Sequence, residues 1–138
     1  MYNTPYLRAL VAVVVGMAAA VIVLGAWQVI VYSAMPGAGT TQGDLREVPT
    51  VTLLVLLAGY ACAAAVGGAV AGRLARAAAA WAVVAVGGVQ TLVAIGNLLN
   101  IAHPAWFMLV SPLVHLPSAW LGARLAGAVG PLRGPTDG

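Results

Sequence analysis

The chain has 138 residues, of which 62% are hydrophobic and 7% are charged, and its mean hydropathy is +1.01. Soluble domains carry roughly 25% charged residues, so three acidic and six basic side chains cannot cover a water-exposed surface. The net charge of +3 comes from arginine alone. An excess this small is typical of a membrane topology signal and not of a nucleic-acid-binding surface.

Four apolar runs follow one another along the chain, at about 7–32, 51–72, 78–100 and 104–126. Each is long enough to cross hydrocarbon as a helix, which needs about 20 residues. The first run is too long for the apolar region of a signal peptide, which spans roughly 7 to 15 residues. Because the alternation of barrel strands is absent, we expect an all-α fold, a four-transmembrane-helix bundle of two antiparallel hairpins that forms a single membrane domain over 1–138.

The connections carry most of the charge and predict the orientation. An exterior loop is expected at 33–50, where Asp44 and Glu47 accompany Arg46, and a cytoplasmic tail at 127–138. The remaining arginines are expected on the other side of the membrane: Arg8, Arg73, Arg76, Arg124 and Arg133. Since positive residues are retained in the cytoplasm, both termini are predicted to be cytoplasmic, in a multi-pass membrane protein.

Small residues recur at four-residue spacing in the second run and predict close helix contacts. One series is Gly59, Ala63 and Gly67, and the other is Ala64, Gly68 and Gly72. Lipid supplies no hydrophobic force between helices, so association depends on the close backbone approach that small residues permit. We therefore expect the second helix at the centre, with Gly16, Ala20 and Gly88 as counterparts. Chance spacing in a chain rich in alanine and glycine is the alternative.

A line of polar residues is predicted inside the membrane. Its members are Gln90 and Asn97 on the third helix and Ser111, His115 and Ser118 on the fourth. Each set lies along one helical face, and Gln90 and His115 fall near mid-membrane, where an unpaired polar group is costly. We expect His115 to bond Gln90 or a carbonyl freed by Pro112 or Pro117. A proton-relay or ligand role for His115 in a cavity is the competing interpretation.

The exterior turn between the last two helices holds Asn100, His103, Pro104 and Trp106. Proline is favoured at the first position of a helix, and His103 is expected to cap that helix or to have a structural role in the turn. The two histidines lie too far apart for a shared metal ion, and the chain has no catalytic motif, so neither a metal nor a cofactor is expected and the protein is predicted not to be an enzyme. The tryptophans are expected to be interfacial anchors.

The segments AVGGAVAGRLA (65–75) and NLLNIAHPAWFMLVSPLVHLPSAWLGARLAG (97–127) resemble a family of short, uncharacterised bacterial four-helix integral membrane proteins with an HPxWF turn and a terminal LGARLA. The matching residues are Gly67, Gly68, Asn97, His103, Pro104, Trp106, Phe107, Pro117, Gly122 and Arg124. The chain departs from this pattern at Ala102, where proline is common, and His115 is not part of it. The resemblance implies a fold and a compartment, and no activity.

Together these features predict a non-enzymatic inner-membrane protein that acts through helix packing, as a small oligomer or an accessory subunit of a larger membrane complex. The lipid bilayer is its expected surrounding, and no nucleic acid is expected as a partner. The alternative is a small homo-oligomeric transporter or channel. For that alternative Gln90, Asn97 and His115 should line a cavity, whereas for the packing role they should bond one another.

Overall fold

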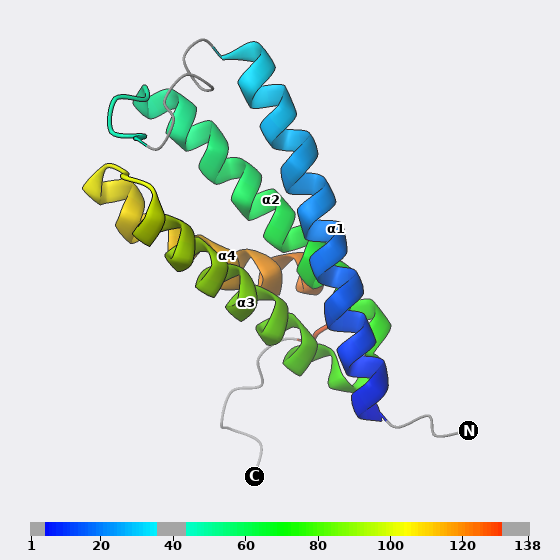
Figure 1. Ribbon diagram of the computed structural model, residues 1–138. Coiled ribbons are helices and arrows are strands. Elements are labelled where there is room, and N and C mark those ends of the chain that lie inside the picture. The colour runs from blue at the N-terminus through cyan, green and yellow to red at the C-terminus, as the bar shows by residue number, and fades with distance from the viewer. Residues whose placement is uncertain (1–4, 36–43, 131–138) are drawn as a thin grey trace.

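The computed structural model describes residues 5–35 and 44–130. Within these ranges the helices are α1 (Pro5–Ala34), α2 (Thr50–Ala75), α3 (Ala79–Asn100) and α4 (Ala105–Leu125), with a short 3-10 helix, η1 (Arg76–Ala78), after α2 (Figure 1). The described part contains no strand beyond an isolated bridge between Asp44 and Ala102. The all-α prediction is therefore confirmed. Of the predicted exterior loop and tail, 36–43 and 131–138 lie outside the described residues.

The predicted count of four separate membrane helices is wrong for this structure. Three helical runs are long and apolar enough to cross a membrane, and they are Pro5–Ala34, Thr50–Asn100 and Ala105–Leu125. The middle run has 51 residues because η1 joins α2 to α3 without a non-helical residue between them. The run reverses direction at Arg76, whose φ of 52° is unusual for a residue with a side chain, so α2 and α3 lie against each other.

Helix α2 is the central element of the bundle. It contacts α1, α3 and α4, whereas α1 and α4 do not contact each other. Its buried residues include both predicted series of small side chains. Helix propensity disfavours glycine inside a helix, so the glycines of α2 are explained by what lies against them.

Three backbone-to-backbone approaches hold the bundle together. A Cβ added at Gly16 of α1 would lie 2.6 Å from the carbonyl oxygen of Gly67. One added at Gly68 would lie 2.7 Å from the Cα of Ala119 in α4, and one at Gly122 would collide with the backbone of Ala65. The predicted contact residues of α2 are thus at helix crossings, where only glycine allows the observed spacing.

The predicted contact between Gly88 of α3 and the small residues of α2 is wrong. A Cβ at Gly88 would meet nothing within 4 Å, whereas one at Gly87 would lie 2.9 Å from the Cα of Leu116. The small residue of α3 that makes a close contact is thus Gly87, and its partner is α4. Gly16 and Ala20 of α1 do approach α2, as predicted, at Gly67.

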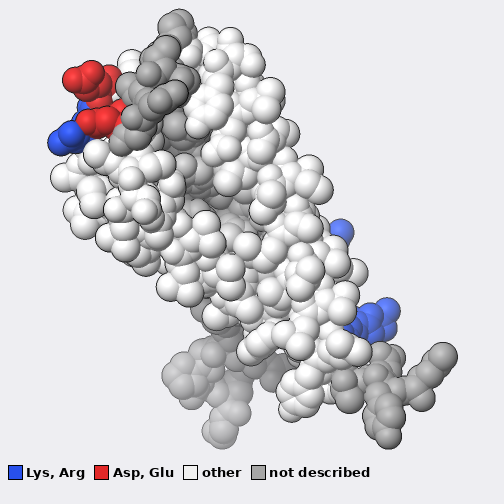
Figure 2. All heavy atoms as spheres, viewed as in Figure 1, with Lys and Arg blue, Asp and Glu red and all other residues white. Residues whose placement is uncertain are grey.

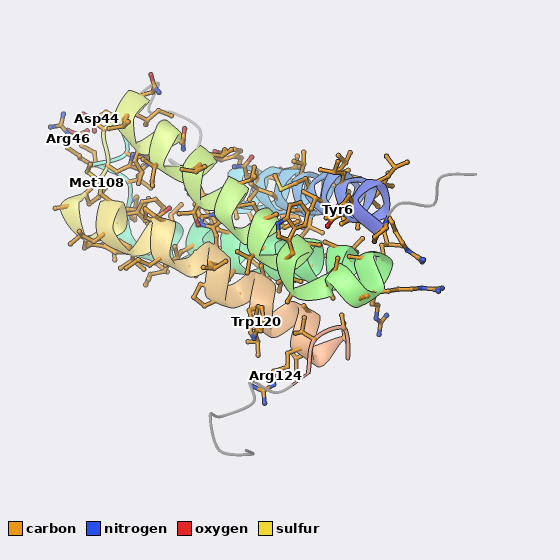
Figure 3. All side chains as sticks on the ribbon, turned by 90° about the horizontal axis from the view of Figure 1, so that it is seen from below. Tyr6, Asp44, Arg46, Met108, Trp120 and Arg124 are labelled. Carbon is orange, nitrogen blue, oxygen red and sulfur yellow. The ribbon has the colours of Figure 1, made fainter. Side chains whose placement is uncertain are left out.

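Charged side chains gather at the two ends of the bundle (Figure 2). At the end called here the arginine end, Arg8 Nε donates to the Leu74 carbonyl at 2.9 Å and Arg73 Nε donates to the Ala126 carbonyl at 3.0 Å. Both acceptors lie at helix C-termini, where cations are favoured. Arg124 is at this end as well (Figure 3). The predicted fifth member, Arg133, lies outside the described residues.

The opposite end, called here the loop end, is closed by large apolar side chains. They form a cluster of Val31, Val48, Leu53, Leu56 and Phe107. The segment after residue 43 is held there by a hydrogen bond of 2.7 Å from the Leu45 amide to the Ala102 carbonyl. Asp44 and Arg46 form an ion pair on the surface of this end (Figure 3). The bond from Arg46 holds the pKa of Asp44 at about 2.

Candidate functional site: a cavity between the helices

A cavity of about 390 Å³ lies in the half of the bundle toward the loop end. All of α1, α2, α3 and α4 contribute to its wall. The polar lining residues are Gln28, Tyr60, Gln90, Asn97, Ser111 and His115, and apolar side chains make up the rest. The cavity therefore has the character of a ligand site, which is an apolar hollow with a few polar groups converging on it.

The floor of the cavity is polar and buried. His115 is 6% exposed and Ser111, one turn earlier on α4, is 2% exposed. The Tyr60 ring of α2 stacks on the imidazole of His115, with ring centres 5.8 Å apart. His115 Nδ1 is buried and has no hydrogen-bond partner in the described part of the chain. Nδ1 has almost no exposed surface, so it does not face the open space of the cavity, and the imidazole interacts with the Pro112 and Ser111 carbonyls of the preceding turn.

The predicted hydrogen bonds of His115 are not found. Gln90 does not form a hydrogen bond with His115. Its Nε2 instead lies 4.0 Å from the Met17 sulfur of α1. A bond from Nδ1 to a carbonyl freed by proline is also absent. Helix α4 continues through Pro112 and Pro117. The polar residues therefore meet at a cavity and do not bond one another.

The remaining predicted members divide between the cavity and its surroundings. Asn97 is exposed and lies at the rim, on the loop side of Gln90. Ser118 is half-buried and does not line the cavity. Thr91, which the sequence analysis omitted, donates to the Gly87 carbonyl at 2.9 Å and lies 3.3 Å from the Pro112 carbonyl. It thereby links α3 to α4 beside the cavity.

The cavity opens sideways between α1 and α3. Val21 of α1 and Val93 of α3 line it and are both 63% exposed, so they form its rim. Beyond them, Gly25 and Gly96 have no neighbour within 4 Å. The two helices diverge toward the loop end (Figure 1), and the surface is hollowed on this face (Figure 2). Small-residue packing around Gly67 closes the other end. The cavity is consequently a lateral recess and not a pore along the bundle.

The predicted turn residues lie outside the cavity. The cap of α4 is Pro104, without a side-chain bond, so the expected cap by His103 is wrong. His103 instead donates from Nδ1 to the Ile101 carbonyl at 2.6 Å, because a carbonyl can only accept, and stacks on Phe107 with ring centres 5.3 Å apart. Trp106 packs edge-on against Phe107. Asn100 is exposed and donates to the Gly96 carbonyl at 2.7 Å.

The sequence analysis missed two residues of the cavity lining and assigned a different role to Trp27 beside it. Tyr60 and Gln28 line the cavity, and each is a polar side chain inside an apolar run, which is a signal that could have found them. Trp27, expected to be an interfacial anchor, instead packs on Gly59 and donates to the Val55 carbonyl at 2.9 Å. It links α1 to α2 beside the cavity.

The chemistry available in the cavity is neutral hydrogen bonding. Its lining contains no aspartate, glutamate, lysine or arginine, and the described residues hold no group of three or more metal-ligating side chains. Comparison of the chain with family models, curated protein sequences and solved structures gave no match. The resemblance to short bacterial membrane proteins stays a prediction. The three long apolar runs are consistent with a membrane protein.

Proposed function

We propose that the chain is a non-enzymatic, multi-pass protein of a bacterial inner membrane whose lateral cavity binds a small molecule, as the binding unit of a small carrier. Both termini lie in the cytoplasm in this proposal, and the 51-residue middle run crosses twice. A straight helix of that length would extend about 77 Å, far beyond the ~30 Å of hydrocarbon, whereas α2 and α3 each match one crossing. The bundle works as a homo-oligomer or within a larger complex.

One observation carries the proposal: Gln90, Asn97, Ser111 and His115 face a common cavity and are not bonded to one another. A purely structural set of polar residues would satisfy itself, because an unpaired polar group in hydrocarbon is costly. Binding energy from a ligand offsets that cost. The closed loop end and the tight packing at the arginine end favour a carrier over a channel.

The packing role remains the second candidate, and the close approaches of α2 favour it. Gly16, Gly68 and Gly122 bring α1 and α4 into backbone contact with α2. A protein that acted only by packing against other helices would need the arginine-end half of the bundle and would not need the cavity. The two roles differ in whether the cavity admits molecules.

Reactivity of a cysteine at position 90 tests the proposal. In a Cys62→Ser background, the Gln90→Cys thiol is expected to react with N-ethylmaleimide in native membranes, because a hydrated cavity lets the thiolate form. Val86→Cys is the buried control, one turn earlier and fully enclosed, and Leu92→Cys is the outer-face control, 69% exposed. Both controls should react far more slowly, Leu92→Cys because hydrocarbon suppresses the thiolate.

A Gln90→Cys thiol that reacts as slowly as both controls would exclude an accessible cavity and leave the packing role. Orientation is tested separately with a reagent that cannot cross the membrane. A cysteine replacing Glu47, at the loop end, should react from outside the cell, and one replacing Arg76 should react only after the membrane is opened.

A further inference from the structure

We infer that the ligand of the cavity is an uncharged amphiphile, with one hydrogen-bonding oxygen as its head and an apolar body, and that it reaches the site sideways from the bilayer. This inference rests on the proposed binding function and adds the class of ligand and the route of access. It follows from the charge of the lining, the polar side chains that face the cavity and the composition of the rim.

The lining excludes a charged ligand. None of its fifteen residues carries a charge, other than through the ionisation of His115 or Tyr60. Transferring an ion from water into an apolar site costs several kcal/mol or more unless an opposite charge receives it. The acidic residues of the described chain, Asp44 and Glu47, lie at the loop end, and Asp44 is engaged by Arg46. Neither a cation nor an anion finds a counter-charge in the cavity.

The floor of the cavity supplies the place for the head. His115 lines the cavity and its ring is held by the stacked Tyr60, so the imidazole is oriented before any ligand arrives. Ser111 lies one turn earlier on the same face, with a hydroxyl that can donate or accept. A single hydroxyl or carbonyl oxygen satisfies these groups. A highly polar solute would leave its other polar groups against apolar side chains.

The residues at the rim of the cavity determine the route by which a ligand enters. Val21 and Val93 flank the opening, and Leu24 and Ala94 continue the apolar wall inward. The loop end is covered by the cluster around Phe107 and the arginine end by close helix packing. The free path between α1 and α3 therefore leads to the surroundings of the bundle at the level of the helices. The volume of about 390 Å³ lies within the ~300–1,000 Å³ of small-molecule sites.

Histidine NMR gives a direct test because the chain has only two histidines. The full chain, labelled with ¹⁵N in its imidazoles, is placed in phosphatidylcholine nanodiscs and titrated with 1-decanol, decane or decyltrimethylammonium. His115→Phe, which keeps a ring against Tyr60, assigns the resonances. We expect decanol to shift the His115 resonance, and His103, whose Nδ1 is bonded to Ile101, to serve as the internal reference.

Two serines of α4 provide matched variants that keep both histidines. Ser111→Ala removes a hydroxyl from the floor, and Ser118→Ala removes one at a half-buried position outside the cavity. Loss of one hydrogen bond to the head should raise the half-saturating decanol concentration by up to about tenfold for Ser111→Ala. Ser118→Ala should leave it unchanged.

The outcomes separate this inference from the proposed function. A shift with decanol alone supports the inference, whereas an equal or larger shift with decyltrimethylammonium or decane overturns it. No shift with any probe, in a protein whose Gln90→Cys thiol still reacts, overturns the ligand class and leaves the binding function standing. A shift that follows protein concentration instead of decanol assigns the cavity to a second copy of the chain and also overturns the inference.

Discussion

Replacing Gly68 by alanine tests the central packing of the bundle. The added Cβ would lie 2.7 Å from both the Cα and the carbonyl carbon of Ala119, whereas ordinary van der Waals contacts begin at 3.4 Å. The neighbouring atoms belong to the backbone of α4, so no side-chain rotation relieves the overlap. The Ala119 carbonyl oxygen would lie nearer still, so the helices must separate by at least about 0.7 Å, which loosens a densely packed contact.

The magnitude follows from two opposing terms. Overpacking of this kind costs about 1–3 kcal/mol, and we expect the upper part of that range because backbone meets backbone. Alanine favours a helix over glycine by up to about 1 kcal/mol. Gly88→Ala introduces the same propensity gain on α3 with no neighbour within 4 Å. Because the propensity gain is common to both variants, their free energies of unfolding should differ by the overpacking cost alone, about 2–3 kcal/mol.

The assay is reversible unfolding in mixed micelles, with the mole fraction of SDS increased stepwise and helix content followed by circular dichroism. Gly68→Ala should unfold at a lower SDS fraction than the parent, and Gly88→Ala at the same or a higher fraction. If both variants unfold together, the contact between α2 and α4 does not limit stability, and the reasoning from close approach is refuted.

Three further predictions concern the two ends of the bundle and the first helix. Trp27→Phe removes the donor to the Val55 carbonyl and should lower the free energy of unfolding by about 1 kcal/mol in the same SDS titration; unchanged stability would contradict a role for this bond. The Asp44 carboxyl should titrate near its pKa of about 2 in a ¹³C NMR experiment, and Arg46→Gln should return it toward 3.8. Because the folded pKa is the lower one, the small stabilisation from this pair is present above pH 3.8 and is lost as the pH falls through 2; a midpoint near 3.8 in the parent would show that the pair does not form. Gly127→Ala places a side chain at a φ of 68° and should lower the free energy of unfolding by about 1 kcal/mol, whereas an equally stable variant would mean that the turn after α4 does not need glycine.

The helical segments were predictable because the signals are local, except that the predicted break between the second and third runs is helical in the structure. Hydropathy along the chain is sufficient for the positions of α1 to α4, since an apolar run of about 20 residues has few alternatives to a helix. Arginines lie at the end of the second and fourth apolar runs, and acidic residues follow the first. These charges distinguish the two ends of the bundle. The four-residue spacing in α2 predicts its crossings at Gly67 and Gly68, because glycine is otherwise unfavourable inside a helix.

The cavity was predictable only as one of two alternatives. The sequence places Gln90 and His115 at similar depth on neighbouring helices, which is compatible with a bond between them or with a shared space. Which one occurs depends on the rotation of α3 and α4 about their axes. That rotation is determined by the seating of Gly87, and not Gly88, against Leu116.

The sequence by itself determined that this protein is helical, where its helices run and which of their faces carry small or polar residues, because each of these properties depends on residues close together along the chain. Only the tertiary structure decided that α1 and α3 diverge, that Tyr60 stacks on His115 and that Nδ1 of His115 is left without a partner. These features arise between helices far apart in sequence, where a rotation of one residue or a displacement of a few tenths of an ångström selects between a hydrogen bond and a cavity.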